Sequence, residues 1–316
     1  QPSWFYVMVV VTVLLLTELK HTFTEFAQRM KNDEMITLAK FLAISGIILP
    51  MLPHKNLIPD INLTPYSIWL ATVVVSGISY LSYLLKRYVF HESGVLVSGI
   101  IGGLYSSTAT ISVLARKSRK ASAQEANEYV AAMLLAVSMM FLRFMILILI
   151  FSREIFMSIY PYLLIMSVVA AVVAWFIHSR QRRSKDLSAD SEEEDSSNPL
   201  EFKVALIFAT LFVIFTVLTH YTLVYAGTGG LNLLSFVSGL SDITPFILNL
   251  LQNTGSVAVL IVVACSMQAI ISNILVNMFY ALFFAGKGSK LRPWILGGFG
   301  TVIGVNLVLL LFFYFI

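Results

Sequence analysis

The sequence predicts an all-α polytopic membrane protein, with about eight spanning helices and two broken segments that enter the membrane and turn back. Its 316 residues are 58% hydrophobic and only 12% charged, whereas soluble domains carry roughly 25% charged residues. The mean hydropathy is +0.85. Several apolar runs approach or exceed the ~20 residues that a helix needs to cross a bilayer. Two further apolar stretches are interrupted by Gly, Ser, Thr or Pro.

The expected spans follow one another along the chain and are separated by polar, charged or proline-containing loops. Pro50 and Pro53 close the second span, and a charged connection at 20–34 precedes it. Each span is apolar enough to lie in lipid. The expected spans are 4–17, 35–52, 66–85, 129–151, 155–177, 204–226, 255–285 and 293–316.

A charged linker at 179–200 divides the chain. It begins with arginines and becomes acidic at Glu192–Asp195. Low hydrophobicity with high charge predicts a disordered segment. We therefore expect N-terminal spans with a connecting surface helix at 1–65, a first arm at 66–178, the cytoplasmic linker at 179–200 and a second arm at 201–316.

The two broken segments, 98–114 and 234–250, resemble each other. When Gly103 is aligned with Gly239, they share Gly-Leu and then Thr, Ile and Leu at matching places. A short motif at 136–139 also returns at 264–267. Each arm therefore consists of a span, a broken segment and two more spans. Interrupted apolar segments at corresponding places in two halves of a membrane protein point to a binding site.

The positions of lysine and arginine favour one topology, because these residues concentrate in short cytoplasmic loops. If both broken segments turn back, 17 of the 19 basic residues outside the spans share one side, whereas crossing segments split them 10 to 9. The basic loops are then cytoplasmic and the arms are inverted repeats. Broken segments entering from opposite faces can meet near the midplane, as in many secondary transporters.

Two charged residues within apolar segments are candidates for function. Asp242 lies in the second broken segment, where an ionisable group costs roughly 2.5–3.5 kcal/mol on insertion scales. Its alternative role is to cap a returning half-helix. Arg143 lies within the expected span 129–151 and could form a pair with Asp242, which would spare both an unpaired burial. The alternative for Arg143 is a different partner, or a side chain that reaches the interface.

Polar uncharged residues complete the expected site. Hydroxyl groups follow two adjacent glycines in the first segment, where the backbone can approach a ligand or another helix closely. The alternative is packing of small residues between helices, and asparagines along 255–285 are either a cavity wall or interhelical contacts. The residues expected to bind an ion or substrate are Asp242, Ser106, Ser107, Thr108, Thr244, Arg143 and Asn273. The glycines expected to act as flexible hinges are Gly102, Gly103 and Gly239.

The best hypothesis is a transporter or channel-like protein for an ion or small polar solute. The alternative is a non-transporting membrane regulator or partner protein, whose function would survive loss of Asp242 but fail when the linker is cut. We expect no enzyme activity and no cofactor, since no nucleophile–base set, phosphate loop or metal motif is present. The expected partners are the lipid bilayer, the solute and possible further copies of the chain, without nucleic acid.

The stretch 102–110, Gly-Gly-Leu-Tyr-Ser-Ser-Thr-Ala-Thr, followed by Leu114-Ala-Arg, resembles a motif of MgtC/SapB-type membrane proteins that carry a long C-terminal domain of unknown function. The resemblance covers most of the chain. It implies a bacterial inner-membrane protein connected with magnesium or ion homeostasis. The chain departs from that pattern at Thr244, where a second acid is common, and at Asn277, where a lysine is common. An acidic metal pair is therefore not implied.

Overall fold

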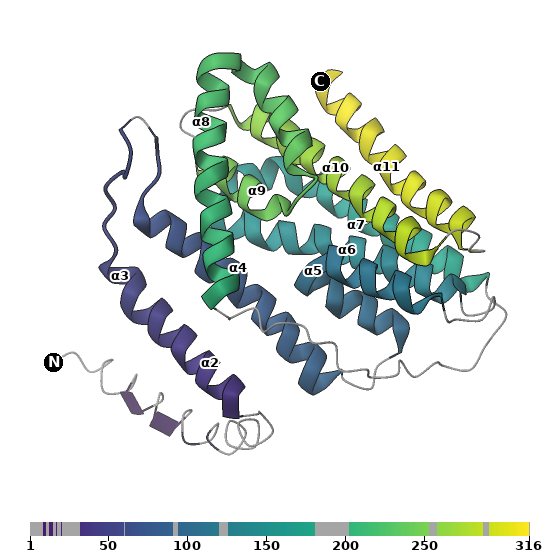
Figure 1. Ribbon diagram of the computed structural model, residues 1–316, viewed down its shortest axis with the longest axis horizontal. Helices are drawn as coiled ribbons and strands as arrows, with labels where there is room; N and C mark the ends of the chain where they lie inside the picture. Colours follow the sequence, from purple (N-terminus) through teal and green to yellow (C-terminus); the bar gives the residue numbers. More distant parts are fainter. Residues whose placement is uncertain are drawn as a thin grey trace. The chain divides into compact units, whose positions relative to one another are not determined.

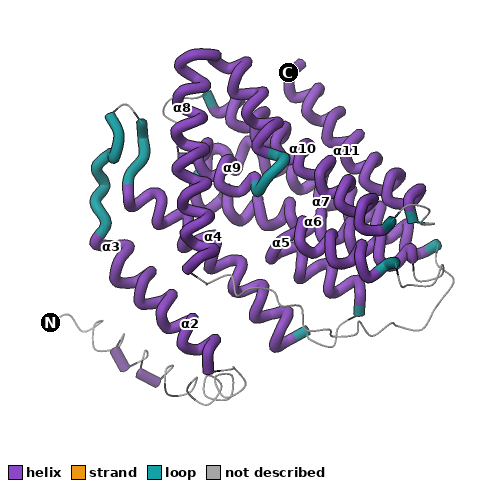
Figure 2. The backbone as a smooth tube through the Cα atoms, viewed as in Figure 1, coloured by secondary structure: helices purple, strands orange, loops and turns teal. Residues whose placement is uncertain are grey.

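The computed structural model describes residues 32–59, 61–90, 94–119, 126–180, 202–252, 258–286 and 291–315, together with isolated positions between 9 and 20. These residues are almost entirely helical (Figure 2), and an isolated β-bridge pairs Ile58 with Ile61. The chain divides into two compact units, 1–51 and 52–316.

The first unit contains α2 (Asn32–Ala43), which continues through a π-helical turn, η1 (Ile44–Ile48), into α3 (Leu49–Met51). This apolar helix occupies most of the expected span at 35–52. The expected span at 4–17 and the surface helix before α2 lie largely outside the described residues.

The second unit is a bundle of helices (Figure 1). Seven of its helices are long and apolar enough to cross a membrane, so the chain is an all-α polytopic membrane protein. Large apolar side chains such as Trp175, which is 69% exposed, lie on the outside as lipid requires. The helices are α4 (Pro65–Leu84) with η2 (Leu85–Val89), α5 (Val95–Lys117), α6 (Ala126–Phe151), α7 (Arg153–Ser179), α8 (Phe202–Ser238), α9 (Ile243–Gln252), α10 (Val259–Ala285) and α11 (Arg292–Phe315).

Local sequence signals explain where several helices begin. Thr64 caps α4 by accepting a hydrogen bond from the backbone N–H of Ser67 at 3.0 Å, and the Ser67 hydroxyl accepts one from the Thr64 N–H at 3.1 Å. This reciprocal capping box is followed by Pro65 in the first turn, where proline is best tolerated. Ser152 caps α7 through the N–H of Ile155. Both caps follow from short polar breaks in otherwise apolar sequence.

α5 is not a straight span, because its chain reverses at Ser106. The backbone there is extended, with φ −159° and ψ 107°. A Cβ on Gly102 would lie 2.5 Å from the Thr110 hydroxyl oxygen, although eight residues of straight helix would separate them by about 12 Å. The two halves of α5 therefore pack side by side as a helical hairpin, in agreement with the break expected within 98–114.

The second broken segment follows a reversal of the chain and is interrupted after Ser238. The chain reverses at Gly227, whose φ of +60° and ψ of −153° suit glycine and few other residues. After the reversal, a Cβ on Gly230 would lie 2.9 Å from the Thr222 side chain, so the last part of α8 returns along the first (Figure 1). α8 then ends at Ser238, and α9 starts at Ile243 after a short non-helical stretch.

Hydrogen bonds between segments that are remote in sequence show which helix ends lie at the same end of the bundle. At one end, the Arg119 guanidinium after α5 donates to the Phe283 carbonyl of α10 at 3.2 Å. At another, the Gln252 amide at the end of α9 donates to the Ser67 carbonyl at the start of α4 at 3.4 Å. If both α5 and the segment from Gly227 to Gln252 crossed the bundle, Arg119 and Phe283 would lie at opposite ends, and if only one of them crossed, Gln252 and Ser67 would lie at opposite ends. Both broken segments therefore return to the end they came from.

Candidate functional site

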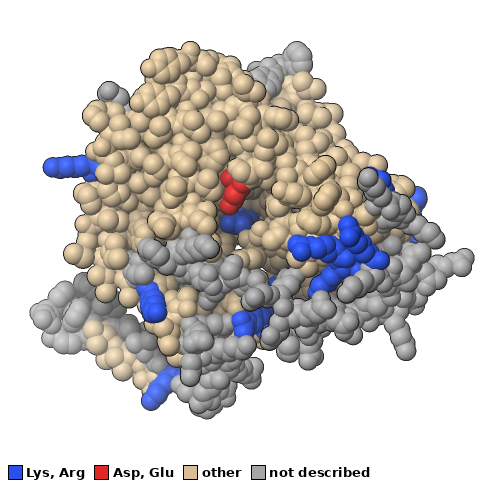
Figure 3. Space-filling model, viewed as in Figure 1, with Lys and Arg blue, Asp and Glu red and all other residues tan. Residues whose placement is uncertain are grey.

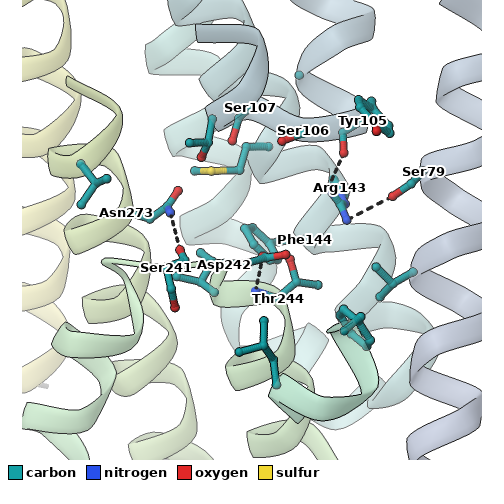
Figure 4. A pocket seen from close by; sticks show the side chains of 18 of the residues that line it. Ser79, Tyr105, Ser106, Ser107, Arg143, Phe144, Ser241, Asp242, Thr244 and Asn273 are labelled. Atoms are coloured by element: carbon teal, nitrogen blue, oxygen red, sulfur yellow. Dashed lines mark hydrogen bonds between the residues drawn. The ribbon is translucent and has the colours of Figure 1, made fainter. Parts of the chain in front are cut away.

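A cavity of about 460 Å³ lies where the two broken segments approach each other. The break of α5 forms one wall and the stretch before α9 forms another, while α4, α6, α8 and α10 supply the rest (Figure 4). Figure 3 shows an acidic and a basic side chain together in a hollow, with uncharged surface above them. The apolar part of the wall comprises Val75, Met140, Phe144, Val204, Ile207, Phe208, Leu211, Leu240, Ile243 and Val276.

The structure brings every residue expected to bind a solute to this one cavity. Its polar lining includes Ser106, Ser107, Thr108, Arg143, Asp242, Thr244 and Asn273. They come from five elements: α5, α6, the loop before α9, α9 itself and α10. The sequence indicates them one by one, and the fold places them on one surface.

Ser106 begins the returning half of α5. Its hydroxyl oxygen accepts a hydrogen bond from the backbone N–H of Ala109 at 3.3 Å, as an N-cap residue does. Ser107 follows and is 8% exposed. The start of a helix carries unpaired N–H groups and a partial positive charge. This wall therefore presents hydroxyls and a helix N-terminus to the cavity.

Asp242 occupies the position in the second segment that is equivalent to Ser106 in the first. Its Oδ1 accepts a hydrogen bond from the backbone N–H of Thr244 at 3.0 Å, so it caps α9. The side chain also remains exposed and lines the cavity. Asp242 can therefore cap α9 and line the cavity at the same time, so the two interpretations of this residue are compatible. The alignment that pairs Gly103 with Gly239 also pairs Ser106 with Asp242.

Arg143 binds the break of the first segment rather than the carboxylate of the second. Its Nη1 donates to the Tyr105 carbonyl at 2.8 Å and its Nη2 donates to the Ser79 hydroxyl at 3.4 Å (Figure 4). Within the described part of the chain no ion pair joins Arg143 to Asp242, so the expected pair is wrong. The carbonyl at the end of the first half-helix of α5 attracts the cation instead.

Asn273 plays the corresponding part at the second break. Its side-chain amide donates to the carbonyls of Gly239 and Ser241, both at 3.3 Å. Asn277, one turn further along α10, donates to the Asn273 amide oxygen at 3.1 Å and so fixes its orientation. Non-helical backbone at membrane depth needs such donors, because lipid offers none. The asparagines thus serve as cavity wall and as interhelical contacts.

Removing the Asn273 amide is expected to destabilise the second break. Asn273→Leu should lower the free energy of unfolding by about 1–3 kcal/mol, since two carbonyls lose a buried donor. Asn273→Asp should be at least as damaging, because a carboxylate of the same size accepts hydrogen bonds and, when ionised, cannot donate them. Thermal unfolding in detergent measures both. An Asn273→Asp protein as stable as the wild type would contradict this role.

The glycines expected to act as hinges are points of close contact between helices. A Cβ on Gly103 would lie 2.5 Å from the Cα of Ala136 in α6, and one on Gly239 would lie 2.6 Å from the Ala269 carbonyl oxygen in α10. Gly102 faces Thr110 across the α5 hairpin. The breaks of the two segments fall at Ser106 and between Ser238 and Ile243, so Gly239 lies at the second break. Close packing explains why no side chain fits at these positions, and the hinge role of Gly102, Gly103 and Gly239 stays a prediction.

The contribution of α4 to the cavity was not predicted from the sequence. Ser76 and Ser79 line the cavity, and Ser79 accepts the Arg143 hydrogen bond. A signal was present, because Thr72, Ser76 and Ser79 recur at helical spacing in an apolar span. Hydroxyls in membrane helices often bond their own backbone, as Thr72 does to the Ile68 carbonyl, so spacing alone does not separate the two roles.

Apolar spanning helices around two inward breaks and a polar cavity define a polytopic membrane protein with an internal site. The chain belongs to the family described as Domain of unknown function (DUF4010), which matches residues 73–285 and so includes both broken segments. It is also 26% identical over 220 residues to an uncharacterised protein of Aquifex aeolicus, covering 69% of this chain and 94% of that protein. No solved structure matches the chain. Neither match bears the MgtC/SapB description, so that resemblance stays a prediction from motifs.

Proposed function

We propose that the chain is a membrane transport protein that moves an ion or small polar solute through the cavity between its two broken segments. The observation that carries the proposal is the convergence of both breaks, with one cation and one anion, on a single cavity inside a membrane bundle. Ionisable groups inside a membrane bundle are rare and mark solute pathways more often than packing.

Three pairs of contacts support two related arms. Ser106 and Asp242 cap the returning half-helices at equivalent places in the two segments. Gly103 packs on α6, and Gly239 packs on α10. Arg143 binds the carbonyl before the first break, and an amide from α10 binds the carbonyls around the second. The same three kinds of contact thus occur once in each arm, as expected of repeats.

The arms are inverted in this proposal. The α5 hairpin opens to the end of the bundle that holds Arg119 and Phe283, whereas the segment ending in Gln252 opens to the end that holds Ser67. Most basic residues outside the spans belong to the first of these ends, which makes it the cytoplasmic one in a bacterial inner membrane. Rocking of one arm against the other would expose the cavity to each side in turn.

The decisive test is flux through purified protein in liposomes, followed for protons, potassium, magnesium, chloride, phosphate and a mixture of labelled amino acids. We expect at least one flux above that of empty liposomes, reduced to background by Asp242→Asn. Glu154→Gln serves as the control, because Glu154 is exposed at the start of α7 and away from the cavity. If no flux appears, or if Asp242→Asn conducts as well as the wild type, the non-transporting alternative is favoured.

A further inference from the structure

We propose that the solute held in this cavity is a zwitterion, an α-amino acid with an apolar side chain, whose carboxylate is bound by Arg143 and whose ammonium group is bound by Asp242. The inference rests on the proposed transport site. It assigns to that site a substrate class that neither the family nor its relative indicates.

The two charges are held apart by the protein itself. Arg143 is anchored at the carbonyl end of the first half-helix of α5, where a cation is favoured. Asp242 is anchored at the N-terminus of α9, where an anion is favoured. Each charge is thus stabilised by a helix end of the suitable sign, and the two remain separate although the carboxylate acts electrostatically on the guanidinium across the cavity.

Both groups keep binding capacity for a ligand. The Nε of Arg143 is buried and has no hydrogen-bond partner, and its Nη2 contact with Ser79 is long at 3.4 Å. Among the described residues, Asp242 is engaged through Oδ1 alone. A guanidinium offers five donors in a fork that fits a carboxylate, and an ionised carboxylate accepts at two oxygens. The unused donor and the unused oxygen are therefore complementary to the two ends of a zwitterion.

A solute with one charge fits the cavity less well. An inorganic anion or a fatty carboxylate would pair with Arg143 and leave Asp242 facing it, whereas a metal cation or an amine would pair with Asp242 and leave Arg143 without a partner. An unpaired charge is most costly at Arg143, whose Nε is buried. The hydroxyls of Ser106 and Ser107 and the N-terminus they begin add donors for the carboxylate end.

The rest of the wall selects the side chain. Phe144, Phe208 and Leu211 contribute to the apolar part of the lining of this cavity of about 460 Å³. This volume lies within the range of pockets that enclose small organic ligands, roughly 300–1,000 Å³. Leucine is a suitable probe, because its side chain is apolar and branched. Isocaproate and isoamylamine are matched analogues that lack its amino and its carboxylate group, respectively.

The test is binding of tritiated leucine to the purified full chain, with competition by unlabelled leucine, isocaproate and isoamylamine. We expect leucine to compete at least about tenfold more strongly than either analogue, since each analogue leaves one charge unpaired. Arg143→Gln and Asp242→Asn should each weaken leucine binding by about tenfold or more. Isocaproate should depend on Arg143 and not on Asp242. Glu154→Gln and Arg292→Gln, both outside the cavity lining, should bind leucine as the wild type does.

The comparison of ligands on the wild-type protein remains decisive even if Arg143→Gln does not fold. Absence of leucine binding to folded wild type, or isocaproate binding as tight as leucine, overturns the zwitterion. Asp242-dependent flux of an inorganic ion without leucine binding would overturn this inference and leave the transport proposal intact. Leucine binding without any flux would retain the ligand class and remove the transport function.

Discussion

Gly103→Ala is expected to lower the stability of the folded protein by about 3 kcal/mol or more, at the upper end of overpacking effects. The added methyl group would lie 2.5 Å from the Cα and 2.6 Å from the carbonyl oxygen of Ala136. Both are backbone atoms of α6, so no side-chain rotation relieves the overlap. Relief requires α5 and α6 to separate, and α5 carries the hydroxyl wall of the cavity.

The same substitution elsewhere provides the control. Gly300 lies in α11, and a Cβ there would meet no atom within 4 Å. Gly300→Ala should therefore leave stability unchanged or raise it by up to about 1 kcal/mol, because alanine favours helix over glycine. Thermal unfolding and yield from the membrane compare the two variants. If Gly103→Ala is as stable as Gly300→Ala, the close approach of α5 to α6 is wrong.

Gly239 should behave as Gly103 does. A Cβ there would contact Ser272 and the Ala269 carbonyl of α10, which corresponds to α6 in the second arm. Matching losses at two positions that align between the segments would be difficult to explain without related arms. A loss at Gly103 alone would instead indicate that the resemblance between the segments is limited to sequence.

Much of this fold can be read from the sequence, because lipid imposes simple requirements on composition. The long apolar runs predict the spanning helices, and the polar interruptions at 98–114 and 234–250 predict where helix gives way. Seven residues chosen for their chemistry then line one cavity. Such residues are conspicuous in apolar sequence, so their shared location follows from the cost of placing them against lipid.

Partners within the site were harder to predict, because helix ends compete with side chains for charge. The sequence suggested a pair between Arg143 and Asp242. In the structure Arg143 donates to the Tyr105 carbonyl, and Asp242 accepts a hydrogen bond from the Thr244 N–H. A break in a helix leaves backbone N–H and C=O groups without partners, and the sequence does not show where these groups will be. The reversal at Ser106 explains both the error for Arg143 and the overlooked role of Ser79.

The second prediction concerns the side of the membrane on which each loop lies, and its outcome is all-or-none. In a Cys265→Ser background, single cysteines would replace Val89 after α4, Arg153 before α7, Thr228 at the reversal of α8, and Arg292 at the start of α11. The latter three positions are exposed, and Val89 is 58% exposed. If both broken segments turn back, 89 and 292 lie on the cytoplasmic side, whereas 153 and 228 lie on the other.

A membrane-impermeant maleimide applied to right-side-out and inverted vesicles measures these positions. We expect cysteines at 89 and 292 to react only in inverted vesicles and those at 153 and 228 only in right-side-out vesicles. If both broken segments crossed instead, all four positions would fall on one side, which would contradict the contact of Arg119 with Phe283. The two-against-two pattern would establish that the broken segments carrying Ser106 and Asp242 enter the membrane from opposite sides, as inverted arms require.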